Sequence, residues 1–340
     1  DIGVDMRLLN NKLNLQFDYF KESREGIYLR RSSIPSYVGM INNPYGNIGK
    51  VENKGFELSV NYANSWGGDW SLSLMGNYSF NRNKVLEDDS TVVYPWQNTI
   101  GNKVGQRFGL VALGLFDSYE EIAASPVQTG DTRPGDIKYQ NLRDDGSSTN
   151  RIDTGDGTFD NPGDRKIIGN NSLRLQYGIN LGVNYKGFDL SVLLQGVGKR
   201  DVWISDARRW PFNSGQFGSL FKDQLDYWKP VDSANGDWTA ANPNAEYFRI
   251  YGQGNNSGYN TRAQAKYLMN GSYLRVKNVT LSYNFPKSWL APITLTSLKA
   301  FVSCENLHTF TKLMKGYDPE RLSWGYPFYR TISFGFNVTL

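Results

Sequence analysis

The sequence predicts an all-β protein, an antiparallel transmembrane β-barrel with long loops at one of its ends. Three observations predict it: apolar and polar residues alternate with a period of two, the alternating segments are about ten residues long, and short and long connections follow one another in turn. A strand of about ten residues can cross a bilayer at a tilt. The average strand of a soluble protein is about half as long.

The strands are read from this alternation. Near 328–340, isoleucine, phenylalanine, valine and leucine alternate with threonine, serine, glycine and asparagine. In 272–285 the phase of the alternation slips, which predicts a β-bulge near Lys277 and Asn278. We predict about nine strands, near residues 2–10, 12–22, 54–64, 69–82, 173–185, 187–199, 272–285, 297–306 and 328–340.

The connections between these strands divide into short and long ones. The short ones are Asn10-Asn11, 65–68, Lys186-Gly187 and 286–296. Outer-membrane barrels have short periplasmic turns and long extracellular loops. We therefore predict extracellular loops near 23–53, 83–172, 200–271 and 307–327, and the whole of 1–340 as one part of a single barrel.

Aromatic residues gather beside the short turns. Because aromatic rings prefer the membrane–water interface, they predict a girdle at the periplasmic end of the barrel. The residues of this predicted girdle are Tyr62, Trp66, Trp70, Tyr185, Phe188, Tyr283, Phe285 and Trp289.

The composition excludes several classes of protein. Apolar residues make up 39% of the chain, the mean hydropathy is -0.52, and no apolar run is long enough for a transmembrane helix. The basic residues are scattered, which indicates no nucleic-acid partner. A single cysteine, Cys304, excludes an internal disulfide framework, and a single histidine, His308, leaves no His-paired catalytic site. We therefore expect a protein that is not an enzyme.

The alternative fold is a soluble β-sandwich, which also alternates apolar and polar residues. The polar faces here carry asparagine, serine, glutamine, glycine and threonine with few lysines or glutamates, which favours the membrane barrel. An open sheet edge in lipid leaves backbone groups without hydrogen bonds, so a barrel must close. We expect the missing strands to lie N-terminal to this chain, which has no signal peptide and is expected to be mature or truncated.

Four segments resemble the SusC/RagA family of TonB-dependent outer-membrane transporters. In chain order they are 48–58 (IGKVENKGFEL), 134–139 (PGDIKY), 270–286 (NGSYLRVKNVTLSYNFP) and 305–320, which begins ENL and ends GYDPE. The resemblance spans nearly the whole chain. One departure is the last residue, Leu340, where outer-membrane barrels commonly carry an aromatic one.

The resemblance implies a plugged, roughly 22-stranded barrel of which this chain is the C-terminal part, with the plug domain absent from it. It further implies import of a large nutrient, an oligosaccharide foremost and otherwise a peptide. The energy for import would come from the TonB complex of the inner membrane, and a SusD-like surface lipoprotein would cap the barrel as a lid. No cofactor is implied.

The acidic stretch 144–164 is the one candidate metal site. Clustered carboxylates among glycine turns suit a hard cation such as Ca²⁺, although the spacing is not that of an EF-hand. The alternative is a solvated, turn-rich loop in which aspartates stabilise turns. The candidate calcium ligands are Asp153, Asp156, Asp160 and Asp164.

The two longest loops are rich in aromatic residues, which stack on sugars and anchor interfaces. The alternative is that these rings pack the loops against one another. The segment from Ser219 to Trp228 predicts a short helix with Phe221 and Leu225 on the same face as Trp228. The candidates for contact with substrate or lid are Trp96, Trp203, Trp210, Tyr227, Trp228 and Trp238.

The polar faces of the strands are predicted to line the lumen. They carry few charges, which favours a neutral cargo over an ionic one. Two other functions stay open at this point: a passive porin-like barrel without a plug, and a soluble β-protein that binds or cleaves carbohydrate. The predicted lumen residues are Asn14, Gln16, Asp18, Asn61, Asn77, Asn180 and Asn184.

Overall fold

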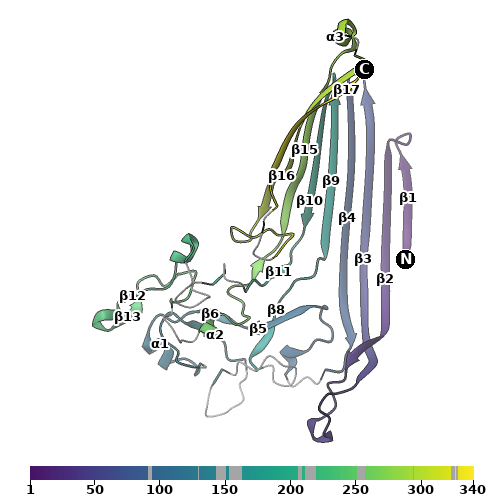
Figure 1. Ribbon diagram of the computed structural model, residues 1–340. Helices are drawn as coiled ribbons and strands as arrows, with labels where there is room; N and C mark the ends of the chain where they lie inside the picture. The colour runs from purple at the N-terminus through teal and green to yellow at the C-terminus, as the bar shows by residue number, and fades with distance from the viewer. Residues whose placement is uncertain are drawn as a thin grey trace.

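The chain forms a single wall of nine antiparallel strands with its long loops gathered at one end (Figure 1). The computed structural model describes residues 1–90, 94–128, 130–142, 151–152, 163–205, 209–210, 220–250, 257–293, 295–322, 326 and 328–340. The strands of the wall are β1 (Ile2–Leu8), β2 (Leu13–Arg30), β3 (Tyr45–Trp66), β4 (Trp70–Glu87), β9 (Leu175–Tyr185), β10 (Phe188–Val197), β15 (Tyr273–Asn284), β16 (Ser297–Thr311) and β17 (Thr331–Thr339).

Each strand of the wall pairs with its nearest neighbour in sequence within the sheet, so the sheet is an up-and-down meander. The tight turns are made by residues with positive φ, which include Asn10, Asn11, Lys186 and Gly187. Lys186 and Gly187 form a two-residue hairpin turn with φ of 45° and 87°, and turns of this kind match the twist of the flanking strands. The helix α3 (Lys287–Leu290) and the 3-10 turn η6 (Ala291–Ile293) lie in the connection from β15 to β16.

The bulge predicted near Lys277 and Asn278 is confirmed. The pairing of β15 with β16 skips Lys277, between Val276 and Asn278, and the pairing with β10 shifts at the same point. The extra residue changes which residues face the polar side, so that Arg275 and Asn278 both lie there. The bulge therefore places Arg275 on the polar face of the sheet.

The apolar face of the wall is exposed. Phe334 and Phe336 of β17 expose 79% and 70% of their surface, and on β1 Ile2 exposes 69%. Apolar surface of this extent is unfavourable in water and favourable in lipid, which excludes the soluble β-sandwich. Within the residues that the structure describes, the other sheets are two-stranded and belong to the loops.

Four strands run beyond their predicted ends. The loop expected at 23–53 is shorter, because β2 continues to Arg30 and β3 begins at Tyr45; β4 likewise continues to Glu87 and β16 to Thr311. The alternation of apolar residues stops where contact with lipid stops, whereas backbone pairing continues. Ion pairs between neighbouring strands stabilise the extension, with Lys21 Nζ 2.9 Å from Glu52 Oε2 and Lys50 Nζ 2.6 Å from Glu25 Oε1.

The long loops have secondary structure of their own. Their helices and 3-10 turns are η1 (Ser36–Val38), η2 (Pro95–Gln97), α1 (Tyr119–Ala123), η4 (Lys222–Leu225), η5 (Ser233–Asn235) and α2 (Ser257–Asn260). Their strand pairs are β5 (Gln106–Leu110) with β8 (Arg165–Asn170), β6 (Ala112–Leu115) with β7 (Ile137–Tyr139), β11 (Asp201–Val202) with β14 (Met269–Asn270), and β12 (Pro230–Asp232) with β13 (Asp237–Ala240).

The helix predicted from Ser219 to Trp228 is wrong. The described part of that segment holds one 3-10 turn, η4, and the residues it was expected to place on one face are separated: Leu225 is exposed and Trp228 is buried. Three apolar residues at helical spacing were too few to outweigh the tertiary contacts that bury Trp228.

The tip of the hairpin from β2 to β3 is held by Asp89, in the loop that follows β4. The backbone N–H and the hydroxyl of Ser33 donate to Asp89 Oδ2 over 2.9 and 2.8 Å, and Arg31 lies 3.8 Å away. The backbone hydrogen bond from Ser33 is the main cause that lowers the pKa of the Asp89 carboxyl below its ordinary value. The tip beyond it is exposed, with Ile41 at 96%.

This contact predicts that the hairpin tip loosens in acid. A carboxyl whose pKa is lowered by folding stabilises the folded form above its unfolded pKa of about 3.9, and the contribution is lost as the pH falls through the lower folded pKa. A nitroxide on Ile41→Cys, in a Cys304→Ser background, should become more mobile between pH 7 and pH values below about 4. The same label in Asp89→Asn should be mobile at both. A spectrum that does not change with pH in the parent protein would refute this role of Asp89.

Candidate functional site

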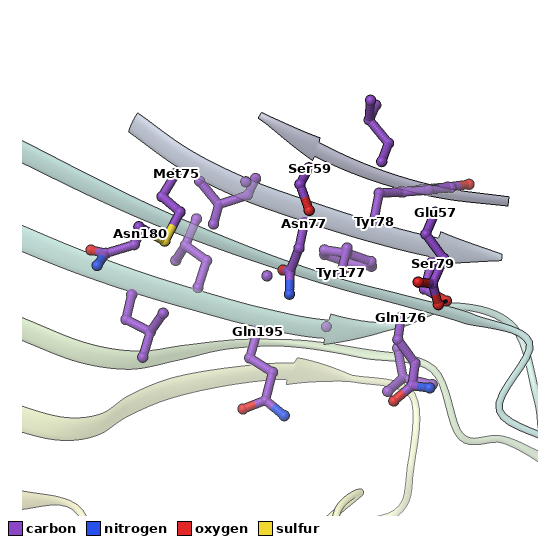
Figure 2. A pocket seen from close by; sticks show the side chains of 18 of the residues that line it. Glu57, Ser59, Met75, Asn77, Tyr78, Ser79, Gln176, Tyr177, Asn180 and Gln195 are labelled. Carbon is purple, nitrogen blue, oxygen red and sulfur yellow. Dashed lines mark hydrogen bonds between the residues drawn. The ribbon is translucent and has the colours of Figure 1, made fainter. Parts of the chain in front are cut away.

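The polar face of the wall surrounds a hollow of about 1090 Å³. Figure 2 shows amide and hydroxyl side chains from β3, β4, β9 and β10 that project into it. They meet there because alternate residues of neighbouring strands share one face. These side chains are Ser59, Asn77, Ser79, Gln176, Asn180 and Gln195.

This hollow carries little charge, and Met75 and Leu193 add apolar surface to its amide and hydroxyl groups. Glu57 is the one acid that these strands contribute to the lining, and its carboxylate accepts a hydrogen bond of 3.2 Å from the Ser79 hydroxyl. At the loop end of the hollow, Arg200 and Glu320 complete the lining. Amide and hydroxyl groups can both donate and accept hydrogen bonds, so the wall suits a neutral, polar molecule.

The predicted lumen residues fall into two groups along the wall. Asn61, Asn77 and Asn180 line the hollow just described. A second hollow, of about 520 Å³, lies nearer the short turns and includes Asn14, Gln16 and Asn61 beside Asp5 and Arg7. The remaining two take part in contacts on the same face: Asp18 pairs with Gly3 in register, and Asn184 donates a hydrogen bond to Asp189.

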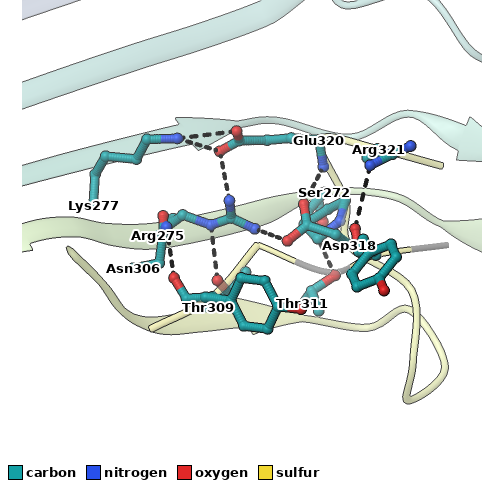
Figure 3. A network of polar contacts seen from close by, with 12 residues as sticks. Ser272, Arg275, Lys277, Asn306, Thr309, Thr311, Asp318, Glu320 and Arg321 are labelled. Carbon is teal, nitrogen blue, oxygen red and sulfur yellow. Dashed lines mark hydrogen bonds and ion pairs between the residues drawn. The ribbon is translucent and has the colours of Figure 1, made fainter. Parts of the chain in front are cut away.

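A charged network closes the hollow at its loop end (Figure 3). The guanidinium of Arg275, on β15, is 1% exposed and lies 2.5 Å from Asp318 Oδ2 and 3.1 Å from Glu320 Oε1. Its Nε donates to the Thr309 hydroxyl over 2.9 Å, and Lys277 Nζ lies 3.0 Å from Glu320 Oε2. The network fastens the loop between β16 and β17 onto the lumen wall.

A second arginine fastens the same loop. Arg200 is buried, and it donates to the backbone carbonyl of Pro319 and, over 3.3 Å, to that of Gly271. Pro319 stands between the two acids that bind Arg275. The whole turn Asp318-Pro319-Glu320 is therefore held against the wall by two buried guanidinium groups.

Sequence reasoning missed this network. It recognised the segments around Arg275 and Glu320 only as family motifs and assigned them no contact. The available signal was the charge of Arg275 and Lys277 in a strand whose other residues are mainly apolar or uncharged. A charged residue in such a strand is costly to bury unless a partner comes from elsewhere in the chain.

The two longest loops share one apolar core, which we call the loop lobe. Trp228 is 1% exposed and Trp210 is 2% exposed, and both lie inside the cluster. Partly buried rings of Trp203, Tyr227 and Trp238 pack against it. The cluster consists of Leu110, Leu115, Ile137, Tyr139, Ile152, Trp210, Trp228, Ala245, Tyr247, Phe248, Tyr259 and Tyr267.

Most of the predicted contact aromatics therefore serve to pack the loops. Trp210 and Trp228 have almost no free surface, so they are no longer candidates for contact with a ligand. Trp203, Tyr227 and Trp238 keep part of their surface free. Trp96 lies outside the cluster, where it stacks on Tyr94 with ring centroids 4.8 Å apart. These four stay predictions.

A buried polar network ties the loops together inside the lobe. The carboxylate of Asp136 is fully buried; it lies 2.9 Å from Arg249 Nε and accepts from Asn260 Nδ2 over 3.2 Å. The side-chain Oδ1 of Asn260 accepts a hydrogen bond from the backbone N–H of Ile137 over 2.8 Å. Asp136 and Ile137 belong to one loop, Arg249 and Asn260 to the other, so these bonds join segments more than a hundred residues apart.

Buried tyrosines complete this network. The Tyr139 hydroxyl donates to the backbone carbonyl of Tyr259 over 2.8 Å. The Tyr259 hydroxyl donates to the backbone carbonyl of Ile137 over 3.0 Å. Burial raises the pKa of both hydroxyls well above the ordinary value, and the pKa of Tyr267 as well. These groups therefore stay neutral donors at any physiological pH.

Gly135 lets this region pack tightly. Its φ is +86°, a conformation that favours glycine, and a Cβ there would lie 2.5 Å from the Trp228 ring and 2.7 Å from the Arg249 Cβ. The motif 134–139 thus has a structural role. Gly135 leaves space for the indole of Trp228, and Asp136 forms an ion pair with Arg249.

The candidate calcium site is only partly described. Asp153, Asp156 and Asp160 lie outside the described residues. Asp164 is fully buried, and its carboxylate accepts the backbone N–H of Leu142 over 3.0 Å. Among the described residues, no group of three or more His, Cys, Asp or Glu side chains could hold a metal ion. A calcium site in 144–164 therefore stays a prediction.

Known proteins share this sheet and this sequence. A family model described as TonB dependent receptor-like, beta-barrel matches residues 1–119. A curated relative, TonB-dependent receptor P3 of Formosa agariphila, is 29% identical over 99% of this chain and 33% of its own length. The SusC receptor of Bacteroides thetaiotaomicron is 23% identical over 94% of this chain. The chain is therefore similar to part of the β-barrel of TonB-dependent receptors. The resemblance to the SusC/RagA family is confirmed by these relatives.

Solved structures support the same fold. The RagAB peptide transporter matches 99% of this chain and 34% of its own, with a TM-score of 0.67 at 20% identity. The chain spans about a third of the length of the curated relatives it matches. TonB-dependent receptors of this kind are transport proteins of the outer membrane and not enzymes. No helix in the part of the chain that the structure describes is long and apolar enough to cross a membrane.

Proposed function

We propose that this chain forms part of the barrel of a TonB-dependent importer whose cargo is a large neutral nutrient, foremost an oligosaccharide. The observation that carries this proposal is the wall of the larger hollow, where serine, asparagine and glutamine side chains from four strands face one space. Sugar hydroxyls pair well with such groups because both can donate and accept hydrogen bonds.

A peptide is the second candidate cargo. It is favoured by the likeness in fold to a structure named as that of a peptide transporter. Amide side chains also pair with a peptide backbone, so the wall is compatible with it. The few charges on the wall argue against strongly ionic peptides.

The importer needs partners outside this chain. The edges of β1 and β17 are unpaired in the described sheet, so further strands must close the barrel in lipid. We expect these strands and a plug domain from the rest of the receptor, energy from the TonB complex, and a SusD-like lipoprotein that covers the loop end. The packed loop lobe supports this last expectation, because it offers a rigid surface at that end.

A bulky side chain in the hollow tests the proposal. In the complete receptor, Asn77→Trp combined with Asn180→Trp should lower uptake of a cognate oligosaccharide by about tenfold or more, because both side chains enter the hollow. Leu74→Trp on the apolar face of β4 is the matched control and should leave uptake unchanged. Equal uptake by both variants would contradict a transport path along this wall.

An uncoupler separates active import from the passive-pore alternative. Uptake by the parent receptor should stop when the proton gradient across the inner membrane is dissipated. Uptake that continues unchanged would support a passive porin-like barrel.

A further inference from the structure

The apolar face of β2, β3 and β4 carries an aromatic belt at each end. At the turn end, Trp70 of β4 stacks on Tyr185 of β9 with ring centroids 4.0 Å apart. At the loop end, Phe56 of β3 lies 5.8 Å from Phe80 of β4 and 6.0 Å from Phe17 of β2. From Trp70 to Phe80 is about 33 Å along the strand, or about 25 Å across the membrane at a usual strand tilt. The two belts therefore mark the two edges of the hydrocarbon layer.

A row of three cations follows immediately beyond the belt at the loop end. Tyr19, Phe56 and Phe80 are neighbours in the sheet, and two residues further along the same face come Lys21, Lys54 and Arg82. The register pairs Lys21 with Lys54 and Lys54 with Arg82, so the three lie side by side across three strands. Neighbouring strands are about 4.8 Å apart, which places the outer two about 10 Å from each other.

The depth of this row matches the lipid headgroups. Two residues advance a strand by about 7 Å, and the headgroup region is about 5 to 7 Å thick on each side of the hydrocarbon. The row also lies on the face that contacts lipid, since alternation puts it on the same side as Phe56 and Phe80. These side chains meet the charged groups of the lipids and cannot reach the lumen.

The row retains positive charge after its internal pairing is counted. Glu52 is the one acid near it on this face, 2.9 Å from Lys21 Nζ and 3.9 Å from Lys54 Nζ. Lys84, which is paired with Glu52 in register, adds a fourth cation. Among the described residues, no carboxylate forms an ion pair with Arg82. The side chains of Lys21 and Lys54 share this one carboxylate and remain 58% and 53% exposed, so an anion can reach them.

The field of Arg82 also reaches a neighbouring loop. The pKa of Lys103 is lowered from its ordinary value, first by burial and then by repulsion from Arg174 and Arg82.

We propose that Lys21, Lys54 and Arg82 form a binding site for the phosphate groups of lipids in the membrane leaflet at the loop end of the barrel. A guanidinium binds phosphate through two parallel hydrogen bonds, and the lysines add point charges on either side. Bound lipid phosphates would tie the hairpin of β2 and β3 to the membrane surface. The site depends on the position of the wall in the membrane and not on the nature of the cargo.

Lipid binding to the complete receptor tests the site. The receptor in detergent micelles is titrated with diphosphorylated lipid A or with its dephosphorylated form, and the bound lipid is measured by native mass spectrometry. In a third titration, inorganic phosphate competes with the diphosphorylated lipid. The variant is Lys21→Gln, Lys54→Gln and Arg82→Gln together. The matched control, Lys12→Gln, Lys186→Gln and Lys287→Gln, loses the same charge from exposed lysines of the turn end.

Each basic residue near an anionic lipid surface contributes roughly fivefold in affinity. The triple variant should therefore bind the diphosphorylated lipid on the order of 10- to 100-fold more weakly than the parent, and the control should bind it like the parent. The parent should discriminate against the dephosphorylated lipid, and millimolar phosphate should not displace the lipid. Arg82→Gln alone removes one charge, should weaken binding by about fivefold, and serves if the triple variant does not fold.

Three results would overturn the site: equal binding by variant and control, equal binding of both lipids by the parent, or displacement of the lipid by inorganic phosphate. The last would indicate a site for the free anion. Nutrient uptake by the triple variant is read separately, so that a failure of this proposal is distinct from a failure of the importer proposal.

Discussion

Replacing Asp136 by alanine is expected to separate the two long loops from each other. The substitution leaves the guanidinium of Arg249 buried without the carboxylate that lies 2.9 Å away, and it removes the acceptor for Asn260. Loss of one partner of a buried ion pair costs about 3 to 5 kcal/mol. Hydrogen exchange of the loop-lobe amides should therefore accelerate by two to three orders of magnitude, roughly, while the strands of the wall keep their protection.

The control for this experiment lies in the same loop. Asp131 also pairs with an arginine, Arg133, at 2.6 Å, but both side chains are exposed. Exposed ion pairs contribute little, so Asp131→Ala should leave the exchange of the lobe nearly unchanged. Similar exchange in the two variants would show that Asp136 does not join the loops. Adding Arg249→Ala to Asp136→Ala should recover part of the loss, because the buried charge is then removed.

Removing the two acids that bind Arg275 is expected to release the loop between β16 and β17. In the double variant Asp318→Asn and Glu320→Gln, a guanidinium that is 1% exposed loses both carboxylates and keeps the Thr309 hydroxyl and the nearby aromatic rings. The cost should again be about 3 to 5 kcal/mol of local stability. Trypsin cleavage after Lys312 and Lys315 should be faster by about a hundredfold.

A rescue variant makes this prediction specific. Buried ion pairs can be replaced by apolar residues at little cost, so adding Arg275→Met to the double variant should restore much of the protease resistance. Arg321→Ala is the control, since the guanidinium of this exposed arginine donates to the Tyr326 carbonyl, over 3.3 Å, and takes no part in binding Arg275. If the double variant resists trypsin as the parent does, the loop is held by other contacts. The loop matters for the proposed function because Pro319 and Glu320 line the larger hollow.

The sequence alone was sufficient for the wall of the barrel. Period-two alternation is a local property, because lipid on one face and polar contacts on the other act on each residue separately. The nine strands and the bulge at Lys277 therefore followed from the residues themselves. The alternation reports contact with lipid, however, and so it could not show that β3 begins as early as Tyr45.

The tertiary structure decided everything that depends on residues far apart in the chain. The sequence shows that Trp228 is aromatic, but whether its ring is buried or accessible to a ligand depends on the packing of two loops, which buries it. Nothing local links Asp136 to Arg249, or Arg275 to Glu320, since each pair is joined by the fold. The same holds for Lys21, Lys54 and Arg82, which are scattered in sequence and adjacent in space because strand register aligns them. Register and loop packing are long-range properties, and they decide which of the predicted residues are free to act.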